Sequence, residues 1–267
     1  MVVRLHTAEL DPAPLDPAKL YLAELDSAAA QAPPAAGVCD GGGDSRGRLD
    51  AVAAVLRGER RAAVVHGDGR ELLRALPDAS IGAVITDPPY PRAYVPLYEQ
   101  LAAALPRVLE RGGSLLTIVP HHALPQVLAA VGRHLKYRWT LCMWQEAGSH
   151  PRMAMGIEVV WKPIVWWVNG AWPMGRGYVK DGFVNSPPAK SHHRWEQSLS
   201  WAEYCLRFVP RGGVVLDPLC GAGTTGVAAV RAGYRYIGVD HDPDVIAVAR
   251  ARVAAALTRA PGEECKA

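Results

Sequence analysis

The residues best placed to do chemistry are Asp87-Pro88-Pro89-Tyr90, which directly follow the apolar run 81–86. Two successive prolines fix two φ angles and remove two backbone N–H donors, so the Pro88 carbonyl is held as an acceptor that no local helix uses. Asp87 adds a second acceptor and Tyr90 adds a flat aromatic face. Two acceptors beside an aromatic platform suit an exocyclic amino group on a planar ring, such as that of adenine or cytosine. The same four residues would also make an ordinary turn, so this interpretation needs support elsewhere in the chain.

A second segment has the pattern of a ligand-binding loop between a strand and a helix. The apolar run 214–217 ends in Asp217 and leads into the glycine-rich stretch 218–226. Backbone can approach a ligand closely in such a loop. The next apolar run, 234–239, is followed by Asp240. A carboxylate at the end of that second strand is well placed to accept both hydroxyls of a ribose.

With both motifs in place, the chain resembles the amino-group DNA methyltransferases that use S-adenosylmethionine. The resemblance is carried by residues 64–90 and 211–253, and with the elements between them it covers roughly residues 60–257. It is closest to the permuted class, in which the catalytic motif precedes the cofactor motif. The two motifs in this order and spacing are much more specific than either one alone.

The resemblance makes Asp87, Pro88, Pro89 and Tyr90 the catalytic residues. Asp87 and the Pro88 carbonyl would accept the two N–H bonds of the target amino group, which favours the positive charge that develops on nitrogen in the transition state. Tyr90 would stack on a base flipped out of its duplex. Neither a metal nor a covalent enzyme intermediate is required.

The resemblance also implies a site for S-adenosylmethionine, formed by Asp68, Asp217, Pro218, Leu219, Gly221, Gly223, Thr224 and Asp240. Asp217 and the backbone of Gly221 and Gly223 would hold the methionine part. Asp240 would bind the ribose hydroxyls, and Asp68 would lie near the adenine.

The chain departs from the family pattern in two places. Where the family usually carries a His-x-x-x-Lys-Pro element, residues 193–198 read HRWEQS, so the roles of His193 and Gln197 do not carry over directly. Leu219 stands where the cofactor loop often has an aromatic residue. Residues 179–185 are predicted to be a loop, and the Ser-Pro-Pro at 186–188 is interpreted as a turn.

A nicotinamide-dependent dehydrogenase is a rival interpretation, because residues 221–226 are literally G-x-G-x-x-G. Such an enzyme would need a second mononucleotide-binding half after this motif. One predicted helix, 243–257, and a polar tail follow Asp240, which leaves no room for it. Asp217 would also repel a pyrophosphate. We therefore disfavour this alternative.

Strands and helices are predicted to alternate from residue 61 onward, which is typical of a parallel sheet with helices on both faces. The expected strands are 62–66, 82–86, 114–119, 137–145, 157–168, 214–217 and 235–239. The expected helices are 49–60, 69–76, 95–110, 122–133, 197–208, 224–232 and 243–257.

The resemblance implies an α/β fold of the Rossmann-like methyltransferase type, with a mixed, mostly parallel, seven-stranded sheet and a circularly permuted motif order. In that fold 137–145 and 157–168 would form an antiparallel hairpin, and Pro163 suggests an edge strand or a bulge.

The Pro/Gly-rich segment 1–47 is predicted to be a flexible N-terminal arm, and 48–267 the catalytic domain. Between the hairpin and the cofactor strands, the insert 169–194 is too short to fold alone. We expect it to recognise a short DNA site as a loop, helped by a partner or by the arm.

Composition narrows the class further. Hydrophobic residues make up 49% of the 267 residues, yet no apolar run is long enough to span a bilayer. The N-terminus lacks a signal-peptide pattern. The five cysteines form no C-x-x-C pair, which argues against zinc and against a disulfide framework. We expect a cytoplasmic protein without membrane or metal.

The net charge of +3 does not by itself identify a nucleic-acid binder, but a local basic cluster suits phosphate contacts. The predicted DNA-contacting residues are Arg176, Lys180, Lys190, His193, Arg194 and Trp195. A second cluster, at 133–138, is equally compatible with an ordinary solvated surface. Trp172 and Trp195 fall in predicted loops, where tryptophans more often touch ligands.

The leading hypothesis is a DNA methyltransferase acting on adenine N6, because the Asp form of the motif at Asp87 favours adenine. Cytosine N4, RNA and a protein amide are the alternative targets. An alternative of another class is an inactive nucleic-acid-binding domain with this fold. DNA is the expected partner, and a partner protein or a homodimer is left open.

Overall fold

The computed structural model of the protein describes residues 45–145, 150–152, 156–172, 178–186 and 197–258. Its centre is a mixed eight-stranded sheet with the order β1-β10-β9-β2-β3-β7-β4-β8. The strands are β1 (Ala62–His66), β2 (Ile81–Thr86), β3 (Leu109–Ile118), β4 (Lys136–Gln145), β7 (Trp161–Val168), β8 (Gly182–Asn185), β9 (Val214–Asp217) and β10 (Arg235–Asp240).

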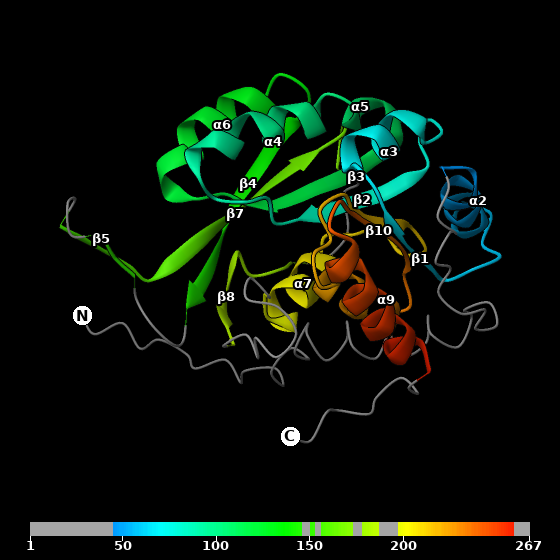
Figure 1. Cartoon of the computed structure of the whole chain (residues 1–267). Coiled ribbons are helices and arrows are strands. Elements are labelled where there is room, and N and C mark those ends of the chain that lie inside the picture. The colour runs from blue at the N-terminus through cyan, green and yellow to red at the C-terminus, as the bar shows by residue number, and fades with distance from the viewer. Residues whose placement is uncertain (1–44, 146–149, 153–155, 173–177, 187–196, 259–267) are drawn as a thin grey trace, which may run out of the picture.

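Parallel pairing dominates this sheet. The strands from β1 to β3 in this order run parallel, and so do β4 and β8. β7 is antiparallel to both of its neighbours, β3 and β4. A separate antiparallel pair, β5 (His150–Arg152) and β6 (Ile157–Val159), lies between β4 and β7 in the chain. Figure 1 shows β5 projecting away from the body of the sheet.

Helices cover both faces of the sheet. One face carries α3 (Gly69–Ala75), α4 (Val95–Ala102), α5 (Leu105–Val108) and α6 (Leu124–Val131), with α2 (Ser45–Leu56) at the β1 end. The other carries α7 (Leu199–Leu206), α8 (Thr224–Arg231) and α9 (Pro243–Thr258), and the two layers are separate in Figure 1. Two 3₁₀ turns, η1 (Arg92–Tyr94) and η2 (His121–Ala123), precede α4 and α6. No helix in the described part of the chain is long and apolar enough to cross a membrane.

The alternation of side chains along each strand divides the core into two halves. In β7, Val165 and Trp167 pack under the α3–α6 layer, whereas Ile164, Trp166 and Val168 pack under the α7–α9 layer. All five are buried, so the strand reads as one continuous apolar run. Such runs in the sequence therefore become central strands with both faces covered.

The order of the strands creates a crevice between β9 and β2. From β9 the chain passes through α8 to β10 on one side, whereas from β2 it passes through α4 and α5 to β3 on the other. Ligands of open α/β sheets bind outside the carboxyl ends of the strands at such a switch point. The Asp87-Pro88-Pro89-Tyr90 motif follows β2 and the glycine-rich loop follows β9, so both lie at this switch point.

The predicted α/β architecture, with a mostly parallel sheet, helices on both faces and the Asp87 turn before the glycine-rich loop, is confirmed. The predicted number of seven strands is wrong. Residues 179–185 were expected to be a loop, but Gly182–Asn185 form the edge strand β8 along β4. The run is short and Val184 in it is 59% exposed, so it lacks the apolar pattern of a buried strand.

Three other expectations need correction. The predicted helix 95–110 breaks into α4 and α5, with Pro106 in the first turn of α5, and β3 already begins at Leu109. The predicted strand 157–168 divides into β6 and β7. The hairpin of β4 and β7 is confirmed, but Pro163 lies inside the sheet and not at an edge. The backbone of Pro163 faces β3, where its carbonyl accepts the Val119 N–H (3.0 Å) one residue beyond the end of β3. The hydrogen bond that proline cannot donate therefore falls at the end of that ladder.

The boundary of the N-terminal arm also shifts. Helix α2 begins at Ser45, ahead of the predicted 49–60, and Arg48 in its first turn donates to the Ser45 hydroxyl (2.9 Å) and to the His66 carbonyl (2.7 Å). Residues 45–47 thus belong to the folded core, while the rest of the predicted arm, 1–44, lies outside the described residues.

Removal of residues 1–44 is expected to leave the thermal unfolding transition unchanged, because α2 and its contacts stay intact. Removal of 1–47 should lower the transition temperature by a few degrees, since it deletes the first turn of α2. Differential scanning calorimetry of both truncations checks this prediction. A large drop in the transition temperature after removal of 1–44 alone would show that the arm packs on the core.

Candidate active site

Four carboxylates of the chain lie after the carboxyl ends of four neighbouring strands. Asp68 follows β1, Asp240 ends β10, Asp217 ends β9 and Asp87 follows β2, and these strands are adjacent in the order β1-β10-β9-β2. Parallel strands place their carboxyl ends at one edge of a sheet. The structure therefore brings the acidic residues of both predicted motifs to the same edge.

Asp87 is the centre of a compact polar cluster. Its Oδ2 accepts hydrogen bonds from the Tyr90 hydroxyl (3.2 Å) and from Gln197 Nε2 (2.6 Å), and Gln197 Nε2 also reaches the Tyr90 oxygen (3.2 Å). Its Oδ1 is buried and has no hydrogen-bond partner among the described residues. A buried acceptor without a donor is costly, so Oδ1 is poised to accept an N–H from a ligand.

Electrostatics around Asp87 act in two directions. Burial raises the pKa of Asp87 to about 6, whereas the charge of Lys162 and the hydrogen bonds from Tyr90 and Gln197 oppose that rise. Lys162 Nζ lies 3.4 Å from the Tyr90 oxygen and 5.2 Å from the centroid of the Tyr90 ring. The carboxylate is thus ionised above about pH 6, and only then can both of its oxygens accept.

Sequence reasoning missed Lys162. The available signal was a single charged residue in the otherwise apolar run 161–168. That signal does not say where β7 lies. Because β7 inserts between β3 and β4, the start of β7 comes close to the turn that follows β2.

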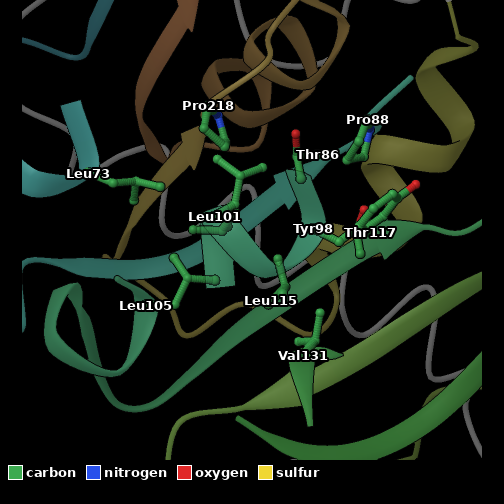
Figure 2. Close-up of a pocket in the computed structure, with 11 residues that line it drawn as sticks. Leu73, Thr86, Pro88, Tyr98, Leu101, Leu105, Leu115, Thr117, Val131 and Pro218 are labelled. Atoms are coloured by element: carbon green, nitrogen blue, oxygen red, sulfur yellow. The ribbon is translucent and has the colours of Figure 1, made fainter. Parts of the chain in front are cut away.

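The turns that contain Pro88 and Pro218 border a small apolar cavity. Figure 2 shows Pro218, Thr86 and Pro88 at one end of this cavity, with Leu115 and Val131 farther into the core. The remaining lining residues are Leu73, Val84, Tyr98, Leu101, Leu105 and Thr117. Pro88 and Pro218 are both buried, so the turns after β2 and β9 rest on packed side chains.

Asp217 is buried at the start of the glycine-rich loop. Its Oδ1 accepts the N–H of Leu219 (3.2 Å). Burial raises the pKa of Asp217 to about 7, and a hydrogen bond from Thr225 partly opposes this rise. A buried carboxylate with few donors would be stabilised by a cation, such as an ammonium group, in the crevice.

The glycine-rich loop turns tightly into α8. Gly223 adopts a positive φ of 79° at the N-cap of α8, and a Cβ there would crowd the backbone of Ala249. Thr224, the first residue of α8, donates to the Gln197 carbonyl (3.4 Å). The loop is thereby connected to the Asp87 cluster through Gln197.

Asp240 braces the glycine-rich loop from the neighbouring strand. Its Oδ2 accepts the N–H of Gly221 (2.9 Å), and its Oδ1 accepts the N–H of Asp242 (3.1 Å) and lies 3.2 Å from His241 Nδ1. The side chain is only 12% exposed. The Gly221 N–H predicted to hold a methionine group is therefore already bonded within the protein.

Asp68, which is predicted to lie near the cofactor adenine, is bonded to a neighbouring arginine. It caps α3 by accepting the N–H of Arg70 (2.8 Å), and its Oδ2 is ion-paired with Arg70 Nη2 (2.6 Å). The hydrogen bond with Arg70 lowers the pKa of Asp68. The next residue, Gly69, touches Pro218 so closely that a Cβ would collide with its carbonyl. This contact binds the loop after β1 to the loop after β9.

The predicted DNA-contacting residues lie mostly beyond what the structure describes. Lys180 is described and exposed, and its carbonyl accepts the Tyr204 hydroxyl (2.6 Å). The others, Arg176, Lys190, His193, Arg194 and Trp195, lie outside the described residues. Trp172 is partly buried and packs edge-on against Trp166, with ring centroids 4.8 Å apart, so it covers the core.

The second basic cluster is engaged within the protein. Arg133 is ion-paired with Glu99 on α4. Arg138 lies with its guanidinium carbon 5.9 Å from the centroid of the Trp166 ring. These contacts favour the interpretation of 133–138 as an ordinary surface.

Comparison with known proteins gives one family and one shared fold. Residues 181–251, which include the glycine-rich loop and Asp240, match the family model described as DNA methylase. Over 50 residues the chain is 48% identical to the Type II methyltransferase M2.DpnII of Streptococcus pneumoniae, and this match spans 19% of each chain. These matches confirm the resemblance to the amino-group DNA methyltransferases.

Solved structures of DNA methyltransferases share the fold. TTHA0409, a putative DNA modification methylase of Thermus thermophilus in complex with S-adenosyl-L-methionine, superposes with a TM-score of 0.60 at 22% identity, over 73% of this chain and 94% of that one. The M1.HpyAVI–SAM complex gives 0.59 at 20% identity, over 72% and 98%. The cytosine-N4-specific PvuII DNA methyltransferase gives 0.59 at 16% identity, over 76% and 88%. The Rossmann-like methyltransferase fold is therefore confirmed.

Proposed function

We propose that this protein is an S-adenosylmethionine-dependent DNA methyltransferase that acts on an exocyclic amino group, and that this group is adenine N6. The observation that carries the proposal is the placement of Asp217 and Asp87 at the ends of β9 and β2, which are adjacent strands at the switch point of the sheet. One motif suits a cationic cofactor and the other suits an amino group, and the two meet in one crevice.

The residues present fit this cofactor. The buried Asp217 suits the ammonium of its methionine part, and the side chain of Asp240 at the end of β10 lies where a ribose would be held. S-adenosylmethionine supplies a methyl group on a positively charged sulfur. Asp68 contributes by fixing the loop after β1 rather than by offering a free carboxylate.

The target side of the crevice then has one task, which is to make the amino nitrogen a better nucleophile. Asp87 Oδ1, the buried oxygen without a partner among the described residues, accepts one N–H, and the Pro88 carbonyl accepts the other. These fixed acceptors stabilise the positive charge that develops on nitrogen. The base stacks on Tyr90, which recovers roughly 1–3 kcal/mol of the cost of flipping it out.

Adenine N6 rests on the aspartate at position 87, and cytosine N4 is the alternative. The assay is transfer of a radiolabelled methyl group to DNA, RNA and protein, followed by digestion of the DNA and separation of its nucleosides. Label in N6-methyl-2′-deoxyadenosine supports the proposal, and label in N4-methyl-2′-deoxycytidine selects the alternative. Transfer to RNA or protein without DNA would contradict it. A partner protein, a homodimer and a cytoplasmic location remain predictions.

Cofactor binding is expected to release one proton below pH 7. In the free protein the pKa of Asp217 is raised to about 7, and an ammonium beside it lowers that pKa. The dissociation constant should therefore fall by up to about tenfold per pH unit as pH rises towards 7, and level off above it. Calorimetry between pH 5.5 and 7.5 in two buffers of different ionisation enthalpy measures this. Asp217→Asn is the control, because it should bind more weakly and without this slope.

A further inference from the structure

We propose that Lys162 and Gln197 are positioning residues for Asp87: Gln197 selects which carboxylate oxygen faces the target, and Lys162 keeps that carboxylate ionised. The inference deepens the proposed function and rests on it for its catalytic consequence. The effect of Lys162 on the ionisation of Asp87 can be tested without any reaction. Neither Lys162 nor Gln197 is needed to contact the reacting nitrogen.

Gln197 acts by occupying one oxygen of Asp87. Its Nε2 lies 2.6 Å from Oδ2, the oxygen that also accepts the Tyr90 hydroxyl, whereas Oδ1 is left without a partner in the described part of the chain. Both protein donors are therefore on one side of the carboxylate. The other oxygen keeps its lone pairs free of donors from the described residues, and we assign it as the acceptor for the target N–H.

Gln197 is itself held from two sides. The backbone carbonyl of Gln197 accepts a hydrogen bond from the Thr224 hydroxyl in the first turn of α8 (3.4 Å). The next residue, Ser198, is buried and donates to Asn185 Oδ1 of β8 (2.6 Å). The backbone at Gln197 is thus anchored to the helix that follows the glycine-rich loop and to the edge of the sheet. The side-chain amide is held by its hydrogen bonds to Asp87 and to the Tyr90 oxygen.

Lys162 acts through charge. It lies at the start of β7, with Nζ 3.4 Å from the Tyr90 oxygen. The groups that face Asp87 from the elements around it are Tyr90 of its own turn, Tyr98 of α4, Gln197 before α7 and Lys162 of β7. Lys162 is the cation in this set, and burial of Asp87 works against the ionised form. A protonated Asp87 would donate where it must accept.

The first test measures the pKa of Asp87 directly. Carboxyl ¹³C NMR titration of aspartate-labelled protein, assigned with Asp87→Asn, should give a midpoint near 6 in the wild type, because that is the value to which burial raises it. Lys162→Met should raise the midpoint by about one unit, since a nearby opposite charge lowers a carboxyl pKa by one unit or more. Lys162→Arg should restore it. An unchanged midpoint in Lys162→Met would overturn the assignment for Lys162.

The matched control is Arg231→Met. Arg231 is exposed and is the last residue of α8, so it lies at the end of the helix that points away from the carboxyl ends of the strands. This variant therefore removes one positive charge far from Asp87. Its midpoint should equal that of the wild type. A shift as large as that of Lys162→Met would mean that net charge, and not position, sets the pKa.

The second test separates the two roles by rate. On mixed-sequence DNA, Lys162→Met should lose about threefold in kcat at pH 6.5, because a rise of the Asp87 midpoint from about 6 to about 7 lowers the ionised fraction by that factor, and it should regain most of the loss at pH 8.5. Gln197→Met should still lose about tenfold in kcat at pH 8.5, with an unchanged KM for DNA. Its loss at pH 6.5 should be larger, because the Gln197 hydrogen bond also lowers the pKa of Asp87. Gln126→Met is its control, because it makes the same change at an exposed glutamine on α6. Equal loss at both pH values in Lys162→Met, or full kcat in Gln197→Met, would overturn the respective role.

The two proposals fail in different ways. If wild-type protein transfers no methyl group to DNA, the proposed function is contradicted, while the NMR midpoints still decide the role of Lys162. If methyl transfer is found but the midpoints do not move, the function stands and the role of Lys162 is wrong.

Discussion

Asp87→Ala is expected to bind cofactor normally and to lose methyl transfer by about 10²–10³-fold. The variant removes the buried Oδ1 that accepts the target N–H, and loss of one preorganised hydrogen-bonding group at a charge-developing centre costs roughly 3–4 kcal/mol of transition-state stabilisation. Single-turnover rates and calorimetric binding on the same preparation measure both quantities. Asp87→Asn should keep more activity, because its amide oxygen can still accept.

The stability of the variant distinguishes catalysis from a merely structural turn. The folded protein holds the pKa of Asp87 at about 6, above the unfolded value of 3.8, so the stabilising contribution of this group is present below the unfolded pKa and is lost as pH rises through about 6. Asp87→Asn should therefore unfold at a temperature no lower than wild type at pH 8. A clearly destabilised variant with full activity per folded molecule would refute the catalytic role.

Asp240→Ala is expected to weaken cofactor binding by about 10²–10⁴-fold. Two hydrogen bonds from ribose hydroxyls to a carboxylate are worth roughly 1.5–3 kcal/mol each, and each 1.4 kcal/mol is a factor of ten in the dissociation constant. The structure adds a second cause, because Asp240 also accepts the Gly221 N–H and so fixes the glycine-rich loop. Isothermal titration calorimetry gives the affinity directly.

Asp242→Ala is the matched control for Asp240→Ala. Asp242 accepts the N–H of Asp244 at the start of α9 (3.0 Å), so its removal costs a helix cap of about 1 kcal/mol without touching the glycine-rich loop. Unchanged affinity in a folded Asp240→Ala protein would mean that the ribose is bound elsewhere. Similar losses in both variants would mean that the effect comes from the loop between β10 and α9.

The sequence allowed the central strands and the site motifs to be predicted because both are local signals. β2, β9 and β10 are short apolar runs, and each ends in or directly before an aspartate that the parallel sheet carries to one edge. The contacts that complete the site are different in kind. Lys162 and Gln197 reach Asp87 from far along the chain, and nothing in their local sequence states which strand or helix will lie beside β2.

The errors have the same origin. β8 exists because β4 offers it an edge, not because Gly182–Asn185 has a strand pattern of its own. The helix predicted over 95–110 was too long because apolar residues continue past Pro106. In the structure α5 ends at Val108 and β3 begins at Leu109.

The order of the strands also makes the molecule modular. The sheet half made of β1, β10 and β9 carries the glycine-rich loop, and the half from β2 to β8 carries the Asp87 turn. Along the chain the second half is one continuous piece, which leaves the first half after α3 and returns to it before α7. At the seam, β2 and β9 pair in parallel at Ala83–Val215 and Val84–Leu216. Exchange of the half that carries the Asp87 turn thus requires two junctions in the chain, and the half that carries the glycine-rich loop keeps its sequence.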